Sequence, residues 1–207
     1  MYLPDVYKIE NDKKIQAFIE ANSFADLVTF HNGELLSNKV PLLFDKPNNC
    51  LYGHFGKSNP QLKHLLSSNE VLVIFSGPHA YISPQWYKSQ NMVPTWNFQT
   101  LQLRGKPRLV NEEKLLTILE KLTAFHESGL DNPWTMKQLA EKPQSVMLQM
   151  IVGFEIDINT IQFKEKMSQN RSEQDQASVI EALKEQGGYE KDRVAQIMND
   201  NLKSTKN

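Results

Sequence analysis

The sequence has very little cysteine and no long apolar run, and each absence restricts what the protein can be. Its single cysteine, Cys50, cannot form a disulfide within the chain, which fits a reducing compartment. No apolar segment is long enough to cross a bilayer, and the N-terminal segment MYLPDVYKIEND lacks the basic and apolar regions of a signal peptide. We therefore expect a soluble cytoplasmic protein that does not enter a membrane.

An excess of positive charge is also missing. The 207 residues include 23 Lys and Arg and 24 Asp and Glu, so that the formal net charge is −1. A protein that holds DNA or an anionic membrane through its overall charge needs a positive excess. DNA therefore remains a possible partner that the charge does not support. No convincing helix-turn-helix with a basic recognition helix is present either.

Two nucleotide-binding motifs are absent from the chain. No GxGxxG follows the first predicted strand, which argues against a dinucleotide-binding fold, and the GxxxxGK[ST] spacing of a phosphate-binding loop does not occur. We also assign no metal ligands. Any nucleotide or phosphate site must therefore be built in another way.

Hydrophobic alternation predicts about six strands, and Asn32-Gly33 marks a tight hairpin between the first two. Helices are expected after the capping residues Asn11, Asn59 and Asn111. Hairpin connections favour an antiparallel barrel with helices outside it over a doubly wound sheet. From residue 164 the composition becomes polar, so we expect a barrel domain over 1–163 and a helical appendage over 164–207, packing on the barrel or on a partner subunit. The predicted strands cover approximately 24–30, 34–44, 50–55, 71–75, 95–110 and 152–163.

The stretch 75–98, FSGPHAYISPQWYKSQNMVPTWNF, concentrates aromatic residues and proline between two predicted strands. Proline fixes φ and removes a backbone donor, so a helix cannot run through this stretch. A rigid aromatic loop can form the wall of a site for a flat ligand. The alternative is a packed aromatic corner whose prolines end the strands.

The segment 56–59, Gly-Lys-Ser-Asn, lies where a predicted strand turns into a helix. Free backbone N–H groups, the Lys57 ammonium and the Ser58 hydroxyl can together bind a phosphate there. The alternative is that Lys57 is a solvated turn lysine.

Several long motifs resemble the PaiB-type family of FMN-binding negative transcriptional regulators. They are NKVPLLF, GHFGKSNPQL, GPHAYISPQWY, VPTWNF and KMSQNR, and they follow the family's order and spacing. The resemblance covers nearly the whole chain. It implies an α+β fold, an antiparallel split β-barrel with peripheral helices, usually as a homodimer that holds FMN at the subunit interface.

The resemblance also implies which residues bind FMN. The family often has histidine at the place of Lys39, and Ala and Arg at the places of Gly56 and Lys57, so Lys57 keeps a cation but loses the bidentate arginine fork. Arg171 could meet the phosphate from a facing subunit or pair with a carboxylate. The cofactor-binding residues that we predict are Ser37, Asn38, Lys39, Val40, His54, Lys57, Ser58, Asn59, Thr95, Trp96, Asn97, Gln169 and Arg171.

Three functions remain open at this point. The first is an FMN-binding negative regulator of transcription, and the second is an FMN-dependent oxidoreductase acting on a small molecule. The third is an interaction module without flavin, which applies if the departures at Lys39 and Lys57 abolish binding. For an oxidoreductase His54, His79 and Tyr81 are candidates for proton transfer, although a structural hydrogen-bonding role is the commoner one for each of them. We assign no catalytic residue.

Overall fold

The computed structural model describes residues 1–204 and has an α+β fold built on a seven-stranded sheet. The strands are β1 Lys8–Ile9, β2 Phe24–His31, β3 Glu34–Asp45, β4 Cys50–Gly56, β5 Val71–Ile82, β6 Thr95–Leu109 and β7 Ile151–Lys166. The α-helices of the described residues are α1 Asp12–Ala21, α2 Gln61–Ser67, α3 Glu112–Glu127, α4 Glu141–Met150, α5 Glu173–Gln186 and α6 Tyr189–Ser204. Short 3-10 turns cover Asp5–Tyr7, Pro84–Trp86 and Met136–Gln138.

The order of the strands confirms the predicted antiparallel barrel. Along the sheet it is β1-β7-β4-β3-β2-β5-β6, and β6 also pairs with β7. The extra pairing joins six strands into a ring and leaves β1 outside it. The registers of β2 with β3 and β5, and of β4 with β3 and β7, are all antiparallel. Among the helices of residues 1–204, none is both long and apolar enough to cross a membrane.

The residues group into two compact units, which we describe separately. We call residues 16–75 and 102–161 the barrel unit, and residues 1–15, 76–101 and 162 onward the terminal unit. The boundaries fall inside α1, β5, β6 and β7, so the chain passes from one unit to the other within continuous elements. The predicted division into domains 1–163 and 164–207 stays a prediction.

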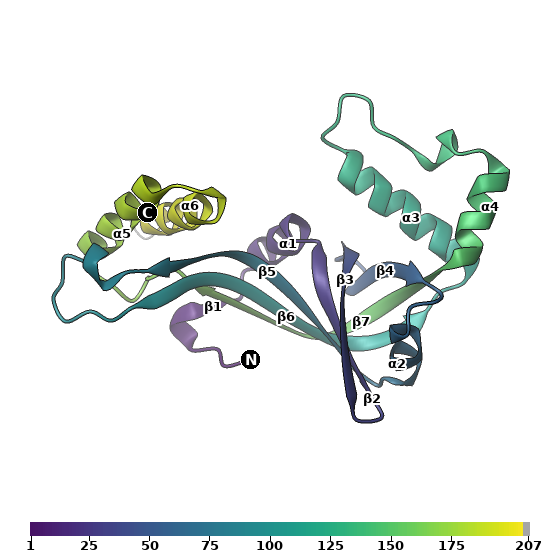
Figure 1. Cartoon of the computed structure of the whole chain (residues 1–207), viewed down its shortest axis with the longest axis horizontal. Coiled ribbons are helices and arrows are strands. Elements are labelled where there is room, and N and C mark those ends of the chain that lie inside the picture. The colour runs from purple at the N-terminus through teal and green to yellow at the C-terminus, as the bar shows by residue number, and fades with distance from the viewer. Residues whose placement is uncertain (205–207) are drawn as a thin grey trace. The chain divides into compact units, whose positions relative to one another are not determined.

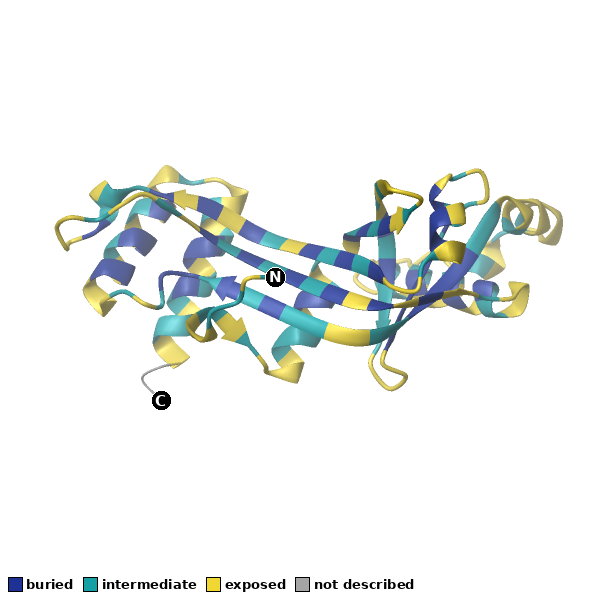
Figure 2. Ribbon diagram, turned by 90° about the horizontal axis from the view of Figure 1, so that it is seen from below, coloured by how far each residue is buried: buried dark blue, intermediate teal, exposed yellow. Residues whose placement is uncertain are grey.

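The strands of the barrel unit bury alternate residues, as their sequences predict. In β2 the side chains of Ala25, Leu27 and Thr29 are buried, and the hairpin to β3 turns at Asn32-Gly33 with φ of 49° and 83°. Both residue types tolerate positive φ, which explains this tight turn. Alternation of buried and exposed residues along the long strands is visible in Figure 2.

Helix α3 begins at the predicted cap and packs one face on the barrel unit. The Asn111 Oδ1 accepts a hydrogen bond from the Lys114 N–H at 2.9 Å, and Leu115, Ile118 and Leu122 are buried. Cys50 belongs to the same buried cluster as Ile118 and Leu122, as expected for a small core residue. An irregular segment with a 3-10 turn joins α3 to α4 (Figure 1).

In the terminal unit, α5 and α6 lie side by side (Figure 1). Ser172 caps α5, and Gly187, with φ of 63°, ends it. The two helices bury apolar residues against the end of β5 and the turn that follows it. That cluster consists of Ala80, Ile82, Tyr87, Met167, Val179, Ile180, Leu183, Val194, Ala195 and Met198.

The aromatic stretch is not a loop from its beginning, and this part of the prediction is wrong. Strand β5 continues from Val71 to Ile82 and includes Pro78. A proline is tolerated in a strand where its missing N–H is not needed by a neighbour, and the register of β5 with β2 covers only Leu72–Ile74. The irregular part of the stretch lies between Ile82 and Thr95 and contains the 3-10 turn Pro84–Trp86.

Candidate functional site

The sequence-predicted site residues fall into two groups, one in each unit. The barrel unit holds those of β3, β4 and the turn before α2, whereas the terminal unit holds those at the start of β6 and after β7. Some of these side chains are engaged within the protein, and others are free to meet a ligand.

On β3, the side chains of Asn38 and Lys39 both have partners. Asn38 Nδ2 donates to Gln61 Oε1 at 2.9 Å. Gln61 is fully buried, and its Nε2 lies 2.7 Å from the Leu27 carbonyl oxygen and 3.2 Å from Thr29 Oγ1. The Lys39 ammonium lies 2.8 Å from Asp26 Oδ2.

The predicted residues of β3 therefore have different roles in the fold. Asn38 and Gln61 tie α2 to the strands, while Lys39 has its charge partly offset by Asp26. Val40 is buried and Ser37 is exposed. The sequence analysis did not predict that Gln61 would connect several strands by hydrogen bonds. A glutamine on the apolar side of a short helix does not indicate such a role.

His54 on β4 carries a buried ring nitrogen without a partner. Its Nδ1 makes no hydrogen bond within the described residues. Burial lowers the pKa of His54 below its ordinary value, so the imidazole is neutral at pH 7. An unpaired buried polar atom is costly, and a ligand atom or a water molecule would reduce that cost.

The turn at 56–59 has fewer free backbone donors than its sequence predicts. The Lys57 N–H donates to the Met150 carbonyl oxygen and the Asn59 N–H to that of Gly56, both at 2.9 Å. Asn59 Oδ1 accepts from the Gln61 N–H at 2.9 Å, although the N-cap position of α2 is Pro60, one residue later than predicted. The expectation of free amides at Lys57 and Asn59 is therefore wrong, because the turn uses them itself.

The side chains of Lys57 and Ser58 nevertheless remain exposed. No ion pair involves the Lys57 ammonium among the residues that the structure describes. A cation and a hydroxyl at this turn can still bind an anion, through side chains rather than through the backbone.

In the terminal unit, the two motifs PTWN and KMSQNR are held together by hydrogen bonds. Lys166 Nζ donates to Thr95 Oγ1 at 2.5 Å and to the Trp96 carbonyl oxygen at 2.7 Å. Asn97 is fully buried and exchanges hydrogen bonds with the Ser168 hydroxyl at 3.0 and 3.1 Å. The structure therefore brings together segments that are 71 residues apart in the chain.

Gln169 and Arg171 differ in whether their side chains have partners within the protein. The Gln169 amide accepts from the Met167 N–H at 2.6 Å and donates to the carbonyl oxygens of Glu165 and Val6. The Arg171 guanidinium lies 5.9 Å from the centre of the Tyr87 ring. Gln169 thus shapes the turn, whereas Arg171 has no acidic partner among the described residues.

Lys166 was missed by the sequence analysis, although it stands directly before the Met167 to Arg171 run. Burial lowers the pKa of its ammonium group, and the nearby positive charges of Lys164 and Arg171 lower it further. Lys164 itself lies 5.2 Å from the ring of Tyr2 and 5.5 Å from that of Phe98. Three cations therefore gather at this end of β7.

Trp96 is about half exposed and lies beside two other exposed rings. Its ring centre is 5.9 Å from that of Tyr81 and 6.1 Å from that of His79. His79 also lies near Glu190, with Nδ1 3.8 Å from Oε2. These rings form an open aromatic surface on β5 and β6, whereas Tyr87 of the same stretch is buried in the core cluster of the terminal unit with Trp86 packed against it.

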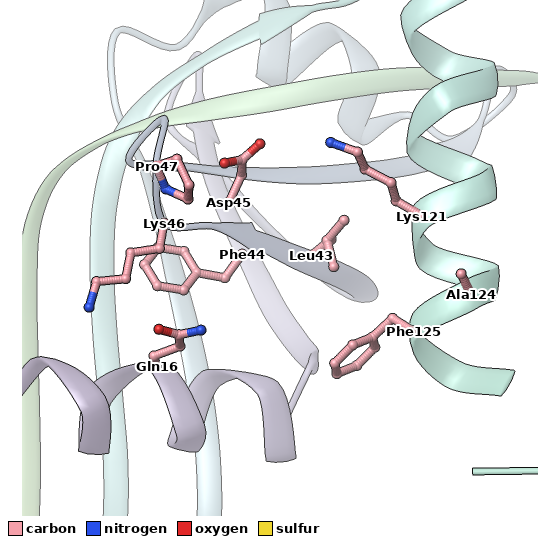
Figure 3. A pocket seen from close by; sticks show the side chains of 9 residues that line it. All are labelled: Gln16, Leu43, Phe44, Asp45, Lys46, Pro47, Lys121, Ala124 and Phe125. Atoms are coloured by element: carbon pink, nitrogen blue, oxygen red, sulfur yellow. The ribbon is translucent and has the colours of Figure 1, made fainter. Parts of the chain in front are cut away.

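A pocket of about 510 Å³ in the barrel unit contains none of the predicted site residues (Figure 3). The Lys121 side chain points across it toward Asp45, above an apolar floor of Leu43 and Phe125 (Figure 3). The Asp45 carboxyl is already engaged with the N–H and the side-chain amide of Asn48. The lining residues are Gln16, Leu43, Phe44, Asp45, Lys46, Pro47, Lys121, Ala124 and Phe125.

Comparisons with known proteins show the family of this chain and agree with its fold. The family model described as "Putative FMN-binding domain" matches residues 1–160. The chain is 38% identical over 205 residues to "Protease synthase and sporulation protein PAI 2" of Bacillus subtilis, covering 98% of this chain and 99% of that protein. It is 30% identical over 230 residues to an uncharacterized protein of Emericella nidulans, covering 90% and 92%.

A solved structure with the same fold is the "FAD and Heme binding protein from Mycobacterium smegmatis". Its TM-score is 0.60, at 12% identity, over 88% of this chain and 81% of that one. At this identity the likeness concerns the fold alone.

Proposed function

We propose, from the premise that this chain belongs to the PaiB-type family of FMN-binding proteins and has FMN as its cofactor, that it is a negative regulator of transcription. The observation that carries the proposal is the family match together with a similarity that spans almost the whole length of a relative. That relative's name refers to protease synthase and sporulation. Repression of transcription is what the family resemblance implies for this chain.

The free side chains of the predicted site fit the chemistry of FMN. A phosphate needs cations and hydroxyl or N–H donors, and Lys57 and Ser58 supply both. An isoalloxazine ring needs an apolar or aromatic surface with a few polar contacts, and the half-exposed Trp96 offers such a surface in the terminal unit. When bound, FMN supplies hydride or single-electron transfer.

Other predicted site residues have side chains that are hydrogen-bonded within the protein. Asn38, Asn97 and Gln169 use their amides within the protein, so we expect them to shape the site rather than to contact FMN. We propose that Arg171 of the partner subunit approaches the phosphate in a homodimer. The exposed apolar side chains of α4 support a dimer, because Val146, Met147 and Met150 are each more than half exposed and no residue of α4 is buried.

The decisive experiment for the cofactor is an absorbance spectrum of freshly purified protein, followed by titration with FMN. Flavin absorption bands in the purified protein, or quenching of the fluorescence of added FMN, are the expected results. A colourless protein that leaves FMN fluorescence unchanged would overturn the proposal and favour a flavin-free interaction module.

We expect the effect on transcription to be indirect, through a partner protein. The exposed faces of α5 and α6 mix both signs of charge, whereas a DNA-reading helix shows a positive excess. Footprinting on promoter DNA over a range of salt concentrations tests this expectation. Protection that weakens as salt rises would show direct binding and contradict it.

The second candidate is an FMN-dependent oxidoreductase of the cytoplasm. The neutral imidazole of His54 favours it, because an unprotonated imidazole can accept a proton as a general base. Consumption of NAD(P)H with an added electron acceptor would support this activity. Absence of turnover with either nicotinamide donor in flavin-loaded protein leaves the regulator as the conclusion.

A further inference from the structure

The largest pocket described above lies in the barrel unit, between the end of β3 and helix α3 (Figure 3). Its volume of about 510 Å³ is in the range of small-molecule sites. Lys121, Ala124 and Phe125 line it from α3, and their spacing of three and one positions places them on one face of the helix. The neighbouring face, with Ile118 and Leu122, is buried and holds α3 in place. The face that lines the pocket is therefore supported and still open to a ligand.

The turn after β3 holds the Asp45 carboxyl in a fixed position. Asp45 Oδ1 accepts from the Asn48 N–H at 3.3 Å, and its Oδ2 accepts from Asn48 Nδ2 at 3.0 Å. The next residue, Asn49, ties the turn to β7, because its Nδ2 donates to the Ile158 carbonyl oxygen at 3.0 Å. A carboxylate has about four lone-pair positions, of which Asn48 uses two. Asp45 can therefore still accept a hydrogen bond from a ligand.

The ammonium group of Lys121 faces this carboxyl across the pocket (Figure 3). Burial acts to raise the pKa of the Asp45 carboxyl, but hydrogen bonds from Asn48 and the positive charge of Lys121 outweigh it and leave the pKa below its ordinary value. The carboxyl is therefore ionised at neutral pH. Among the residues that the structure describes, Asp45 and Lys121 nevertheless form no ion pair. The pocket thus presents a negative and a positive group that stand apart.

An apolar surface lies beside these two charged groups. Leu43 and Phe125 form the floor below them, and the ammonium group of Lys46 points away from both (Figure 3). An apolar group placed on this floor leaves water at a gain of about 25 cal/mol per Å² of buried surface. A ligand that matches the whole pocket therefore carries an ammonium group, a carboxylate and an apolar side chain.

We infer that this pocket binds a free apolar α-amino acid, with its carboxylate on Lys121, its ammonium group on Asp45 and its side chain on Leu43 and Phe125. An acid without the ammonium group would be repelled by Asp45, and an amine without the carboxylate would be repelled by Lys121. Such repulsion selects the zwitterion over either of its halves. The inference is independent of the flavin, because none of the residues proposed for FMN lines this pocket.

The test is isothermal titration calorimetry of the full-length protein with L-leucine, isocaproate and isoamylamine. Isocaproate is leucine without its ammonium group, and isoamylamine is leucine without its carboxylate. L-Leucine should bind with a dissociation constant of about 1 mM or lower, and each analogue should bind at least about tenfold more weakly. Absence of leucine binding, or equal binding of either analogue, would overturn the inference.

Two variants assign the charged contacts. Lys121→Gln should weaken L-leucine by about tenfold and bring its affinity close to that of isoamylamine, because the carboxylate then has no cation to meet. Asp45→Asn should likewise bring L-leucine close to isocaproate. A purely structural role of either residue would not change these ratios. Lys63→Gln is the matched control, since Lys63 is an exposed lysine of α2 outside the pocket, and it should leave all affinities unchanged.

A third variant fills the pocket from an exposed position of α3. Ala124→Phe should weaken L-leucine by more than tenfold, with an unchanged circular dichroism spectrum and melting temperature. The affinity for FMN should stay within twofold of wild type in Lys121→Gln and in Ala124→Phe. If the wild-type protein binds L-leucine and all three variants bind it within twofold of wild type, the amino acid binds elsewhere and the inference is overturned. Loss of FMN binding in these variants would assign the pocket to the flavin and overturn it as well.

Discussion

At the scale of single residues, the site divides into side chains with partners and side chains without them. Asn97 and Gln169 are tied into hydrogen bonds, whereas Lys57 and Arg171 have no acidic partner in the part of the chain that the structure describes. A sequence motif does not distinguish these cases, because both kinds of residue stand within the same short runs.

Lys57→Ala should weaken the binding of FMN by about 1–3 kcal/mol, the usual scale for a charge-assisted hydrogen bond to phosphate. Because riboflavin has no phosphate, its binding should be affected much less. Isothermal titration of both ligands measures the difference, and Lys63→Ala serves as the control because Lys63 is an exposed lysine of the nearby helix α2. An equal loss for both ligands would refute the phosphate role.

Glu155→Gln should remove part of the acid sensitivity of the fold. Burial acts to raise the pKa of the Glu155 carboxyl, but hydrogen bonds from Lys114 and Arg108 outweigh it and leave the pKa below its ordinary value. Because the pKa of this carboxyl is lower in the folded protein than in the unfolded protein, where it is about 4.5, the ionised carboxyl stabilises the fold above pH 4.5. This stabilisation is lost as the pH falls through the folded-state pKa.

The measurement is urea unfolding of both proteins at neutral pH and at several acidic values. Wild-type protein should be more stable than Glu155→Gln at neutral pH by about 1–3 kcal/mol, and the gap should narrow as the pH falls below 4.5. A gap that stays constant down to acidic pH would show that the charge of Glu155 does not contribute.

At the scale of elements, β6 has a glycine, Gly105, where its backbone lies close against β7. A Cβ built on Gly105 would lie 2.3 Å from the Asp157 carbonyl oxygen and 2.6 Å from the Ile156 side chain. Real Cβ atoms do not approach a backbone oxygen so closely, so the glycine is required by the neighbouring strand. The close contact with β7 is the physical reason for the glycine.

Gly105→Ala should therefore destabilise the protein by about 1–3 kcal/mol, the usual cost of overpacking. Gly129→Ala is its matched control, since nothing lies within 4 Å of a Cβ at Gly129. Thermal unfolding followed by circular dichroism gives both values. Similar melting temperatures for the two variants would contradict the strand contact.

The sequence predicted the strands well and the joining of distant segments poorly. Local signals such as Asn32-Gly33, Asn11 and Asn111 act within a few residues, and the structure confirms the elements that they begin or connect. The continuation of β5 through Pro78 depends on which strand lies beside it, and the loss of free amides at 57 and 59 depends on Met150 and Gly56. Such features arise from contacts that a pattern along the chain does not contain.

At the scale of the whole molecule, we expect a homodimer. Helix α4 has the sequence EKPQSVMLQM and leaves its largest apolar side chains exposed, which is unfavourable in water unless another surface covers them. Light scattering coupled to gel filtration should give about twice the chain mass of 23.8 kDa.

Met147→Glu should shift that dimer toward the monomer, because it places a charge on the exposed apolar face of α4. Gln149→Glu adds the same charge to the same helix outside that apolar set and should leave the mass unchanged. A mass that stays dimeric in Met147→Glu would locate the interface elsewhere, and a monomeric wild type would exclude the homodimer.

The mutual hydrogen bonds of Asn97 and Ser168 have a consequence for protein engineering. A chimera that takes only one of these two segments from a distant relative would leave a buried amide without its counterpart. Successful transplants will have to exchange both segments at once, as a matched pair.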